Sequence, residues 1–228
     1  MDRRLFLALA AGGLAGPAGA QDFGKAVGGL LGAGLGLPAG VTGAQAEGGL
    51  REALIAGAVS AVLRVGRPDG YWGDTKIRIP LPGVLGRTQR TLTKLGLSAP
   101  LDDLQRKVNI SAEKAAPQAR DMFTGAIRAM TVDDVVGVLR GGDTSATDYL
   151  NQKTTPQLIG LFRQPMASAL TSTGALRSLD RAVTKNGLAG ALGGNPTDIL
   201  TNFAVTKALD GLFFYVGEEE RAIRHMTR

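Results

Sequence analysis

Apolar residues recur at three- and four-residue spacings through most of the chain from Glu47 onward. This periodicity is typical of helices that bury one face. The first such segment ends near Gly66, and the last and longest begins at Thr197 or Asp198. The apolar face of the first segment comprises Leu50, Leu54, Ala58, Ala61, Val62 and Val65. Because glycine and proline interrupt the pattern at short intervals, the sequence predicts an all-α, compact bundle of roughly eight to ten short helices.

Several helix boundaries are marked by capping signals. Thr131 to Asp134 has the form of a capping box, in which an acid lies three residues after the capping threonine. A short helix through Tyr149 and a separate helix starting at Thr155-Pro156 are expected next, because proline suits the first turn of a helix. One more helix is expected over 174–185, before a glycine-rich loop at 187–196.

Residues 69–83 are the least helical part of this pattern and predict one long extended loop. Asp69-Gly70 is a turn signal, Ile77-Arg78-Ile79 alternates like a short strand, and two prolines favour extended backbone before them. The loop contains Trp72, the only tryptophan of the chain. A long ordered loop in a helical protein is often functional. The alternative is that its apolar side chains plug the end of the bundle.

The first twenty residues have the form of a secretory signal peptide. Arg3 and Arg4 precede a short apolar stretch, and Ala18-Gly19-Ala20 fits a signal peptidase site before Gln21. The two arginines also fit a twin-arginine signal, so export by the Sec or the twin-arginine route is open. We therefore expect a protein of the bacterial periplasm that is soluble after cleavage.

Residues 21–48 are rich in glycine and are interpreted as a flexible linker before a helical domain over 49–228. The alternative is a helix that associates with a membrane or a partner. Five glycines fall four residues apart and would form one stripe of small residues, at positions Gly24, Gly28, Gly32, Gly36 and Gly40.

Residue types exclude several kinds of chemistry. The chain has no cysteine, so it holds no disulfide, thiolate metal site or cysteine nucleophile. Its one histidine, His225, is the fourth residue from the end, and a Ser–His–Asp triad would have to use it. Phosphate-binding, dinucleotide-binding and zinc-protease motifs do not occur. We therefore predict no catalytic residue, no metal site and no cofactor.

Positive charge is concentrated in one block. Residues 61–120 contain 11 basic and 5 acidic side chains, whereas 121–228 contain 11 of each. Five basic residues follow one another with no acid between them, namely Lys76, Arg78, Arg87, Arg90 and Lys94. Such a block can meet an anionic lipid surface or an acidic envelope protein, and expected export argues against nucleic acid. The alternative is a solvated basic face.

A combination of short motifs resembles a known family. The motifs are Gly49-Leu50-Arg51-Glu52-Ala53-Leu54, Asp69-Gly70-Tyr71, Ile77-Arg78-Ile79-Pro80-Leu81-Pro82, Gly141-Gly142-Asp143 and Lys207-Ala208-Leu209-Asp210-Gly211-Leu212-Phe213. Together they resemble a bacterial domain of unknown function, DUF family 4197, over residues 46–226. The resemblance implies an exported, mostly helical bacterial protein and transfers no activity.

The leading functional hypothesis is a non-catalytic binding module for an apolar or amphipathic small molecule or for an envelope partner. It predicts an apolar pocket near Trp72, Arg78 and the last helix. The candidate binding residues are Asp69, Tyr71, Trp72, Arg78, Asp210, Phe214, Glu219 and Arg221.

Two alternatives remain: a structural or scaffold protein of the envelope that acts through an exposed apolar patch, and a hydrolase. The hydrolase would require Asp69, Arg78, Asp210 and the run 218–220 to converge. The non-functional interpretation of 218–220 is a solvent-exposed helix face with salt bridges, for example between Glu220 and Arg224. A glycine after Asp210, inside a helix, indicates close packing by another helix or by the loop 69–83.

Overall fold

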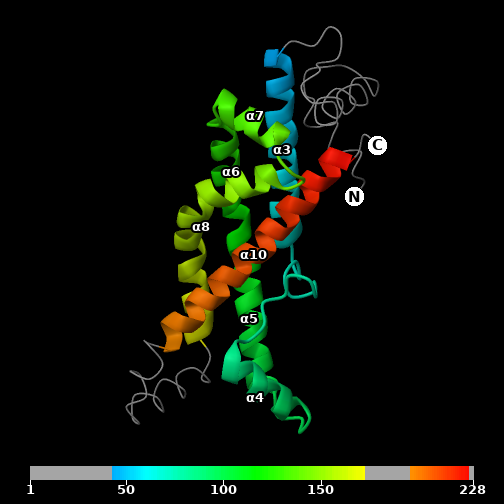
Figure 1. The fold of residues 1–228 in the computed structure, drawn as a ribbon. Helices are drawn as coiled ribbons and strands as arrows, with labels where there is room; N and C mark the ends of the chain where they lie inside the picture. The colour runs from blue at the N-terminus through cyan, green and yellow to red at the C-terminus, as the bar shows by residue number, and fades with distance from the viewer. Residues whose placement is uncertain (1–42, 173–195, 226–228) are drawn as a thin grey trace. The chain divides into compact units, whose positions relative to one another are not determined.

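A computed structural model describes residues 43–172 and 196–225, and those residues contain helices and no strand (Figure 1). Seven α-helices and one 3₁₀ turn follow one another in this described part of the chain. They are α3 (Gly43–Gly66), α4 (Gly83–Thr93), α5 (Ala99–Ala115), η1 (Ala116–Gln118), α6 (Ala119–Arg128), α7 (Val132–Arg140), α8 (Ser145–Thr171) and α10 (Pro196–His225). The all-α class is therefore confirmed, and residues 43–172 and 196–225 hold fewer helices than the eight to ten expected for the chain.

Within the described residues, one boundary expected between two helices is missing, because α8 is continuous. The two helices expected on either side of Thr155-Pro156 form a single helix of 27 residues with Pro156 inside it. A proline inside a helix leaves the carbonyl four residues earlier without its N–H partner. That carbonyl belongs to Gln152, which is exposed, so water can take the place of the lost donor.

The first described helix begins earlier than the expected boundary at residue 49, because α3 starts at Gly43. Alanine and glutamine follow this glycine, and both favour helix. The signal peptide expected over 1–20, the linker up to residue 42, the glycine stripe and the helix expected over 174–185 lie outside the described residues.

The contacts of the chain divide it into two compact units. Unit 1 contains residues up to Val62, Arg120–Thr155 and Phe213–Arg228. Unit 2 contains Leu63–Ala119 and Pro156–Leu212. Helices α3, α8 and α10 each contribute residues to both units.

Unit 1 is held by a buried apolar core and by polar side chains that close its helix ends. The rings of Phe123 and Phe213 lie 5.7 Å apart between centroids. Thr131 and Asp134 form the predicted capping box at the start of α7, which confirms that sequence signal. Arg51 on α3 donates to the carbonyls of Ile127 and Met130 at 2.8 and 2.7 Å, beside the C-terminal end of α6. These bonds supply donors to carbonyl groups that a helix leaves open at its end.

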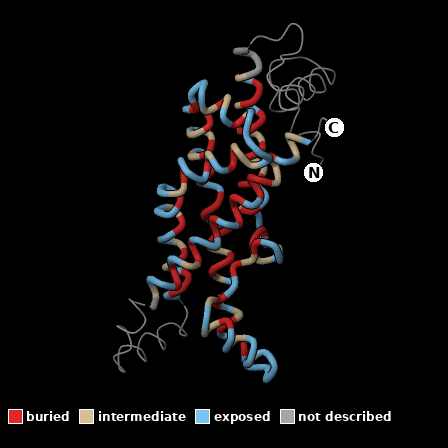
Figure 2. Tube along the Cα trace, viewed as in Figure 1, coloured by how far each residue is buried: buried red, intermediate tan, exposed pale blue. Residues whose placement is uncertain are grey.

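Unit 2 contains the loop between α3 and α4, together with α4, α5 and parts of α8 and α10. Buried residues occur in each of these elements, as the colours in Figure 2 show. The fully buried members include Tyr71, Ile79, Leu104, Leu158, Phe162, Met166 and Leu212. The loop therefore contributes to the core of unit 2 as well as to its surface.

Helix α10 is long and apolar enough over Thr197–His225 to cross a membrane, judged by length and composition alone. Of its most apolar stretch, 61% is buried inside the protein. This burial is what a core helix of a folded protein shows, because its apolar side chains are already covered by neighbouring elements.

Candidate functional site

The loop between α3 and α4, residues 67–82, is the element that the sequence singles out as functional. It begins with tight turns: Asp69 has a positive φ of 58°, and the Gly70 N–H donates to the Arg67 carbonyl at 2.9 Å. A second turn joins the Arg78 N–H to the Asp74 carbonyl at 2.8 Å. The chain then runs without helix to Gly83, so the expected long loop is present.

The stretch predicted to resemble a strand pairs with a side chain instead of with another strand. The Ile79 N–H donates to Asn109 Oδ1 at 2.8 Å, and Asn109 Nδ2 donates to the Ile79 carbonyl at 3.0 Å. Gln105 Nε2 donates to the same carbonyl at 3.1 Å. Asn109 is completely buried, so these bonds satisfy groups that water does not reach. The predicted alternation is nevertheless present in burial, since Ile77 and Ile79 are buried and Arg78 is half-buried.

A buried carboxylate holds the other end of the loop. Glu113, which is 5% exposed, accepts the N–H groups of Tyr71 and Trp72 on Oε1 at 3.1 and 3.0 Å. Gln105, Asn109 and Glu113 lie four residues apart, so they share one face of α5. This polar face of α5, which we call the loop brace, bonds the backbone of the loop at both of its ends.

Tyr71 fastens the loop to α10 within unit 2. Its hydroxyl donates to the Ala208 carbonyl at 2.7 Å, and the side chain is fully buried. Burial raises the pKa of the Tyr71 phenol, and the negative charge of Glu113 raises it further. A Cβ atom on Gly211 would lie 2.9 Å from Tyr71 Cε1 and 3.0 Å from Ile77 Cβ. The glycine inside α10 is therefore explained by close contact with the loop, which was one of the two expectations.

On the outer side of the loop, two guanidinium groups lie over the ring of Trp72. The Arg78 and Arg106 Cζ atoms are 4.9 and 5.6 Å from the ring centroid, which is the range of cation–π contacts. Arg78 is also fixed by its Nε, which donates to the Trp72 carbonyl at 2.6 Å. Arg106 is exposed and lies 4.0 Å from Asp69. We call Trp72, Arg78 and Arg106 the Trp72 surface.

The depression at the loop differs from the apolar pocket predicted near Trp72, Arg78 and the last helix. The depression at the loop, of about 420 Å³, is lined by polar groups and backbone, at Arg67, Pro68, Asp69, Gly73, Asp74 and Thr75. The apolar side chains of the loop at Tyr71, Ile77, Ile79 and Leu81 are buried, so they belong to the core of unit 2. In unit 1 a void of about 10 Å³ lies among Leu54, Gly57, Ala58, Ala146, Thr147, Leu150, Val216, Glu220 and Ile223. It holds at most about one water molecule.

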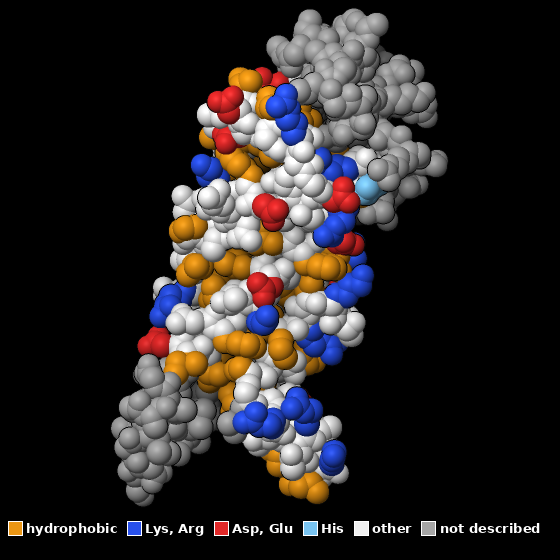
Figure 3. Space-filling model, in the orientation of Figure 1, with side chains coloured by type: hydrophobic (Ala, Val, Ile, Leu, Met, Phe, Trp, Pro, Cys, Tyr) orange, Lys and Arg blue, Asp and Glu red, His pale blue; other side chains and the backbone are white. Residues whose placement is uncertain are grey.

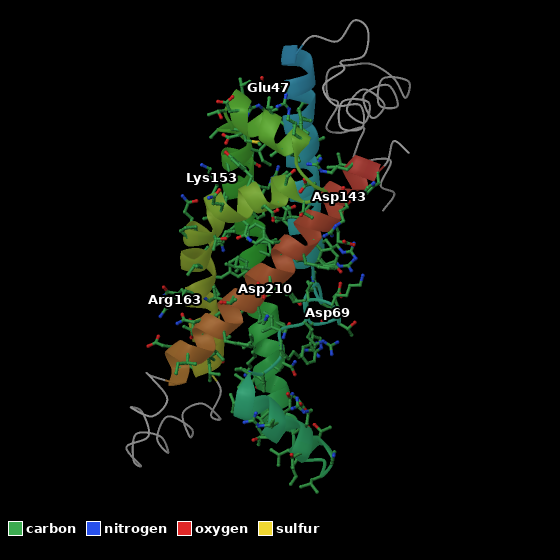
Figure 4. All side chains as sticks on the ribbon, in the orientation of Figure 1. Glu47, Asp69, Asp143, Lys153, Arg163 and Asp210 are labelled. Carbon is green, nitrogen blue, oxygen red and sulfur yellow. The ribbon has the colours of Figure 1, made fainter. Side chains whose placement is uncertain are left out.

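Three of the four remaining candidates have local partners, and the fourth, Glu219, is half-buried on α10. Asp210 pairs with Lys207 on α10 at 2.8 Å, on the exposed side of the helix (Figure 4). Arg221 pairs with Glu218 at 2.6 Å. The ring of Phe214 meets that of Tyr215 edge-on, at 5.1 Å between centroids.

The structure therefore brings four of the eight candidates together on one loop. Asp69, Tyr71, Trp72 and Arg78 share residues 67–82 in unit 2. Phe214, Glu219 and Arg221 belong to unit 1. Of the four loop candidates, Tyr71 is an internal anchor, because its side chain is fully buried.

Glu220 has a role that the solvent-face interpretation of 218–220 missed. The expected pair between Glu220 and Arg224 is present at 2.8 Å, but Glu220 is only 3% exposed. Its carboxylate accepts the N–H groups of Ala146 and Thr147 at 2.9 and 2.8 Å, in the first turn of α8. Negative charge is favourable there because a helix start has open N–H groups and a positive dipole end. Arg224 also donates to the Val138 carbonyl at 2.8 Å.

Three of the groups proposed for a hydrolase each bond to other partners. Asp210 bonds Lys207, Arg78 bonds a carbonyl of its own loop, and Glu220 bonds the start of α8. In residues 43–172 and 196–225, no three His, Asp or Glu side chains are placed to hold a metal ion.

Sequence reasoning missed the residues that position the loop. Gln105, Asn109 and Glu113 are polar and regularly spaced, so they are indistinguishable from the solvent face of a helix. The available signal was that a long loop with buried apolar residues needs partners for its backbone groups. A polar stripe at four-residue spacing on the following helix is one source of such partners.

The fold and the loop brace define an all-α protein that presents a fixed polar and aromatic loop. Comparison with known families agrees with the resemblance seen in the sequence. The family described as "protein of unknown function (DUF4197)" matches residues 40–228, and the chain belongs to this family. No curated protein and no solved structure matches the chain.

Proposed function

We propose that the chain is an exported, non-catalytic binding module of the bacterial cell envelope that recognises an acidic partner through the Trp72 surface. The observation that carries this proposal is the loop brace. Because buried side chains of α5 bond the backbone on either side of the surface, Trp72 and Arg78 are positioned before a partner arrives. Such preorganisation lowers the entropy cost of binding.

The chemistry of the surface favours an anionic partner. Arginine offers a planar set of donors that suits carboxylates and phosphates. Excess positive charge in 61–120 attracts such groups over a longer range. An apolar small molecule is less favoured, because the depression at the loop is polar. The signal-like pattern in residues 1–20 supports export.

Export is tested by expressing the full chain in a Gram-negative bacterium and separating periplasm from cytoplasm. We expect a periplasmic product whose mass corresponds to a start at Gln21. Replacing Arg3 and Arg4 together by lysine blocks the twin-arginine route and leaves the Sec route open, so it distinguishes the two. A product that stays in the cytoplasm with residues 1–20 attached would contradict the proposed location.

Binding is tested with the fluorescence of Trp72, which is the only tryptophan and therefore reports on this surface alone. We expect dextran sulfate to change the emission at low salt and neutral dextran to leave it unchanged. Arg106→Gln should weaken binding by roughly three- to tenfold, since one charge contact of the surface is lost. Arg163→Gln is the matched control, because Arg163 is equally exposed and also pairs with an acid, Asp198. Equal effects of the two variants would contradict recognition at the Trp72 surface.

A further inference from the structure

The turn between α4 and α5 exposes two leucines. Leu95 and Leu97 are 66% and 62% exposed, although they are flanked by two ordered helices. Apolar side chains exposed close together can mark a surface that a partner covers. We call residues 94–98 the hairpin tip.

Backbone hydrogen bonds give the hairpin tip a defined conformation. The Leu97 N–H donates to the Leu92 carbonyl at 2.9 Å, and the Gly96 N–H donates to the Thr93 carbonyl at 3.1 Å. This pair of bonds is the Schellman motif, which requires a left-handed residue, and Gly96 supplies it with a φ of 71°. The leucines are therefore displayed by a regular helix end and not by a frayed one.

Side-chain hydrogen bonds also join α4 to α5 next to the hairpin tip. Gln89 Nε2 donates to Asp102 Oδ1 at 2.7 Å and to Gln105 Oε1 at 2.9 Å. Ser98 Oγ donates to the other oxygen of Asp102 at 2.6 Å. The bonds from Ser98 and Gln89 lower the pKa of Asp102, so its carboxylate is charged and bonded at neutral pH. Helices α4 and α5 of unit 2 are therefore held together by side-chain hydrogen bonds next to the hairpin tip.

Three basic side chains precede Leu95 and Leu97 in the sequence. Arg87, Arg90 and Lys94 are exposed, and none of them lies within ion-pair distance of an acid among the residues that the structure describes. The sequence contains no acid between Asp74 and Asp102. Figure 3 shows Lys and Arg side chains gathered over the α4 region of unit 2, with hydrophobic side chains beside them.

We propose that the hairpin tip docks on an anionic lipid bilayer, with Leu95 and Leu97 entering the interface and the three cations contacting lipid phosphates. A bilayer surface offers both an apolar layer and negative charge within a short distance. A second copy of the chain fits less well, because a symmetric contact at the tip would bring like charges together. This inference rests on the proposed envelope location but not on the Trp72 surface.

The first test is co-sedimentation of the full chain with vesicles of phosphatidylglycerol and phosphatidylcholine, compared with phosphatidylcholine alone. Leu95→Ser with Leu97→Ser should weaken binding to the anionic vesicles by about tenfold or more. Leu63→Ser is the control, because Leu63 is also an exposed leucine of unit 2. Arg87→Gln with Arg90→Gln and Lys94→Gln should have a comparable effect. The same charge change at the exposed residues Arg120, Arg128 and Arg140 should have little effect.

The second test reports insertion at one position. Because the chain has no cysteine, Leu97→Cys can be labelled uniquely with an environment-sensitive dye. We expect a blue shift on anionic vesicles and quenching by a quencher placed in the lipid tails, and neither change with the dye at Leu63→Cys. Residues 1–42 are identical in all variants, so they do not account for a difference between the two positions.

Three results would overturn the proposal. They are equal dye responses at positions 63 and 97, unchanged vesicle binding by the double serine variant, and self-association without lipid that the same variant abolishes. Arg106→Gln separates the two proposals: it should impair dextran sulfate binding and leave dye insertion at position 97 intact. Loss of insertion in that variant alone would place the membrane contact at the Trp72 surface and contradict docking by the tip.

Discussion

Asn109 pairs with both backbone polar groups of Ile79, at 2.8 and 3.0 Å, so one amide on α5 supplies the two bonds that a neighbouring strand would give. An extended segment needs such partners wherever it is buried, because unpaired N–H and C=O groups are costly away from water. The loop can therefore lie against a helix without a sheet. Glu113 likewise supplies a hydrogen-bond acceptor for two successive backbone N–H groups, those of Tyr71 and Trp72.

Replacing Asn109 by alanine should lower the free energy of unfolding by about 2–4 kcal/mol, because it leaves buried backbone groups of Ile79 with fewer partners. The change is measured by urea denaturation of the full chain. Asn202→Ala, at an exposed position of α10, should change stability by less than about 0.5 kcal/mol. Equal effects of the two substitutions would show that the side chain of Asn109 does not hold the loop.

The helical class, the capping box at Thr131 and the position of the long loop follow from local patterns, and all three are present. Local patterns are informative there because helix periodicity and caps depend on residues within one or two turns. Pro156 shows the limit of such signals. It fits both the start of a helix and an exposed position inside one, and the contacts of the whole helix decide between them.

The candidate site was predicted only in part, for a related reason. Tyr71 and Trp72 are conspicuous because aromatic residues are scarce in this chain, but their opposite roles depend on burial. Asn109 and Glu113 become recognisable only when the loop is known to fold onto α5. The basic residues of α4 are evident in the sequence as a charge block, whereas the exposure of Leu95 beside them depends on the fold.

Glu220→Gln should destabilise the protein by about 2–4 kcal/mol. The substitution removes a buried carboxylate that accepts hydrogen bonds from two N–H groups of α8 and pairs with Arg224. An amide retains only one acceptor oxygen and would turn a donor toward the other N–H. Amide hydrogen exchange at Ala146 and Thr147 should become faster in this variant.

Glu219→Gln is the control for this prediction, because Glu219 is the preceding residue and is not buried. Its substitution should change stability by less than about 0.5 kcal/mol. If both glutamine variants unfold at the same urea concentration as the wild type, Glu220 does not stabilise the start of α8.

Tyr71→Phe should change how stability depends on alkaline pH. The phenol has a raised pKa in the folded protein, whereas in the unfolded chain it titrates near the ordinary value of 10.0. Above that pH the unfolded chain releases a proton that the folded protein retains, so wild-type stability falls as pH rises. The phenylalanine variant lacks this effect, and its unfolding free energy should fall less steeply by up to about 1.4 kcal/mol per pH unit.

At neutral pH the same variant should be less stable than the wild type by about 1 kcal/mol, because the hydrogen bond to the Ala208 carbonyl is lost. Urea denaturation at pH 7 and between pH 10 and 11 measures both effects. Tyr149→Phe is a useful comparison, since Tyr149 is only half-buried and its raised pKa arises from burial together with the charge of Asp134. Parallel curves for the wild type and Tyr71→Phe above pH 10 would contradict the raised pKa.

Two glycines inside helices should respond to alanine with opposite signs. At Gly160 on α8 a Cβ atom would meet nothing within 4 Å, so alanine should stabilise the helix by up to about 1 kcal/mol. At Gly211 on α10 the same atom would lie 2.9 Å from the buried ring of Tyr71. Overpacking of this kind costs about 1–3 kcal/mol, which exceeds the gain in helix propensity. Gly211→Ala should therefore lower the urea midpoint and alter Trp72 fluorescence, because the loop must move away from α10. Stabilisation by both substitutions would show that the loop does not pack closely on α10 at Gly211.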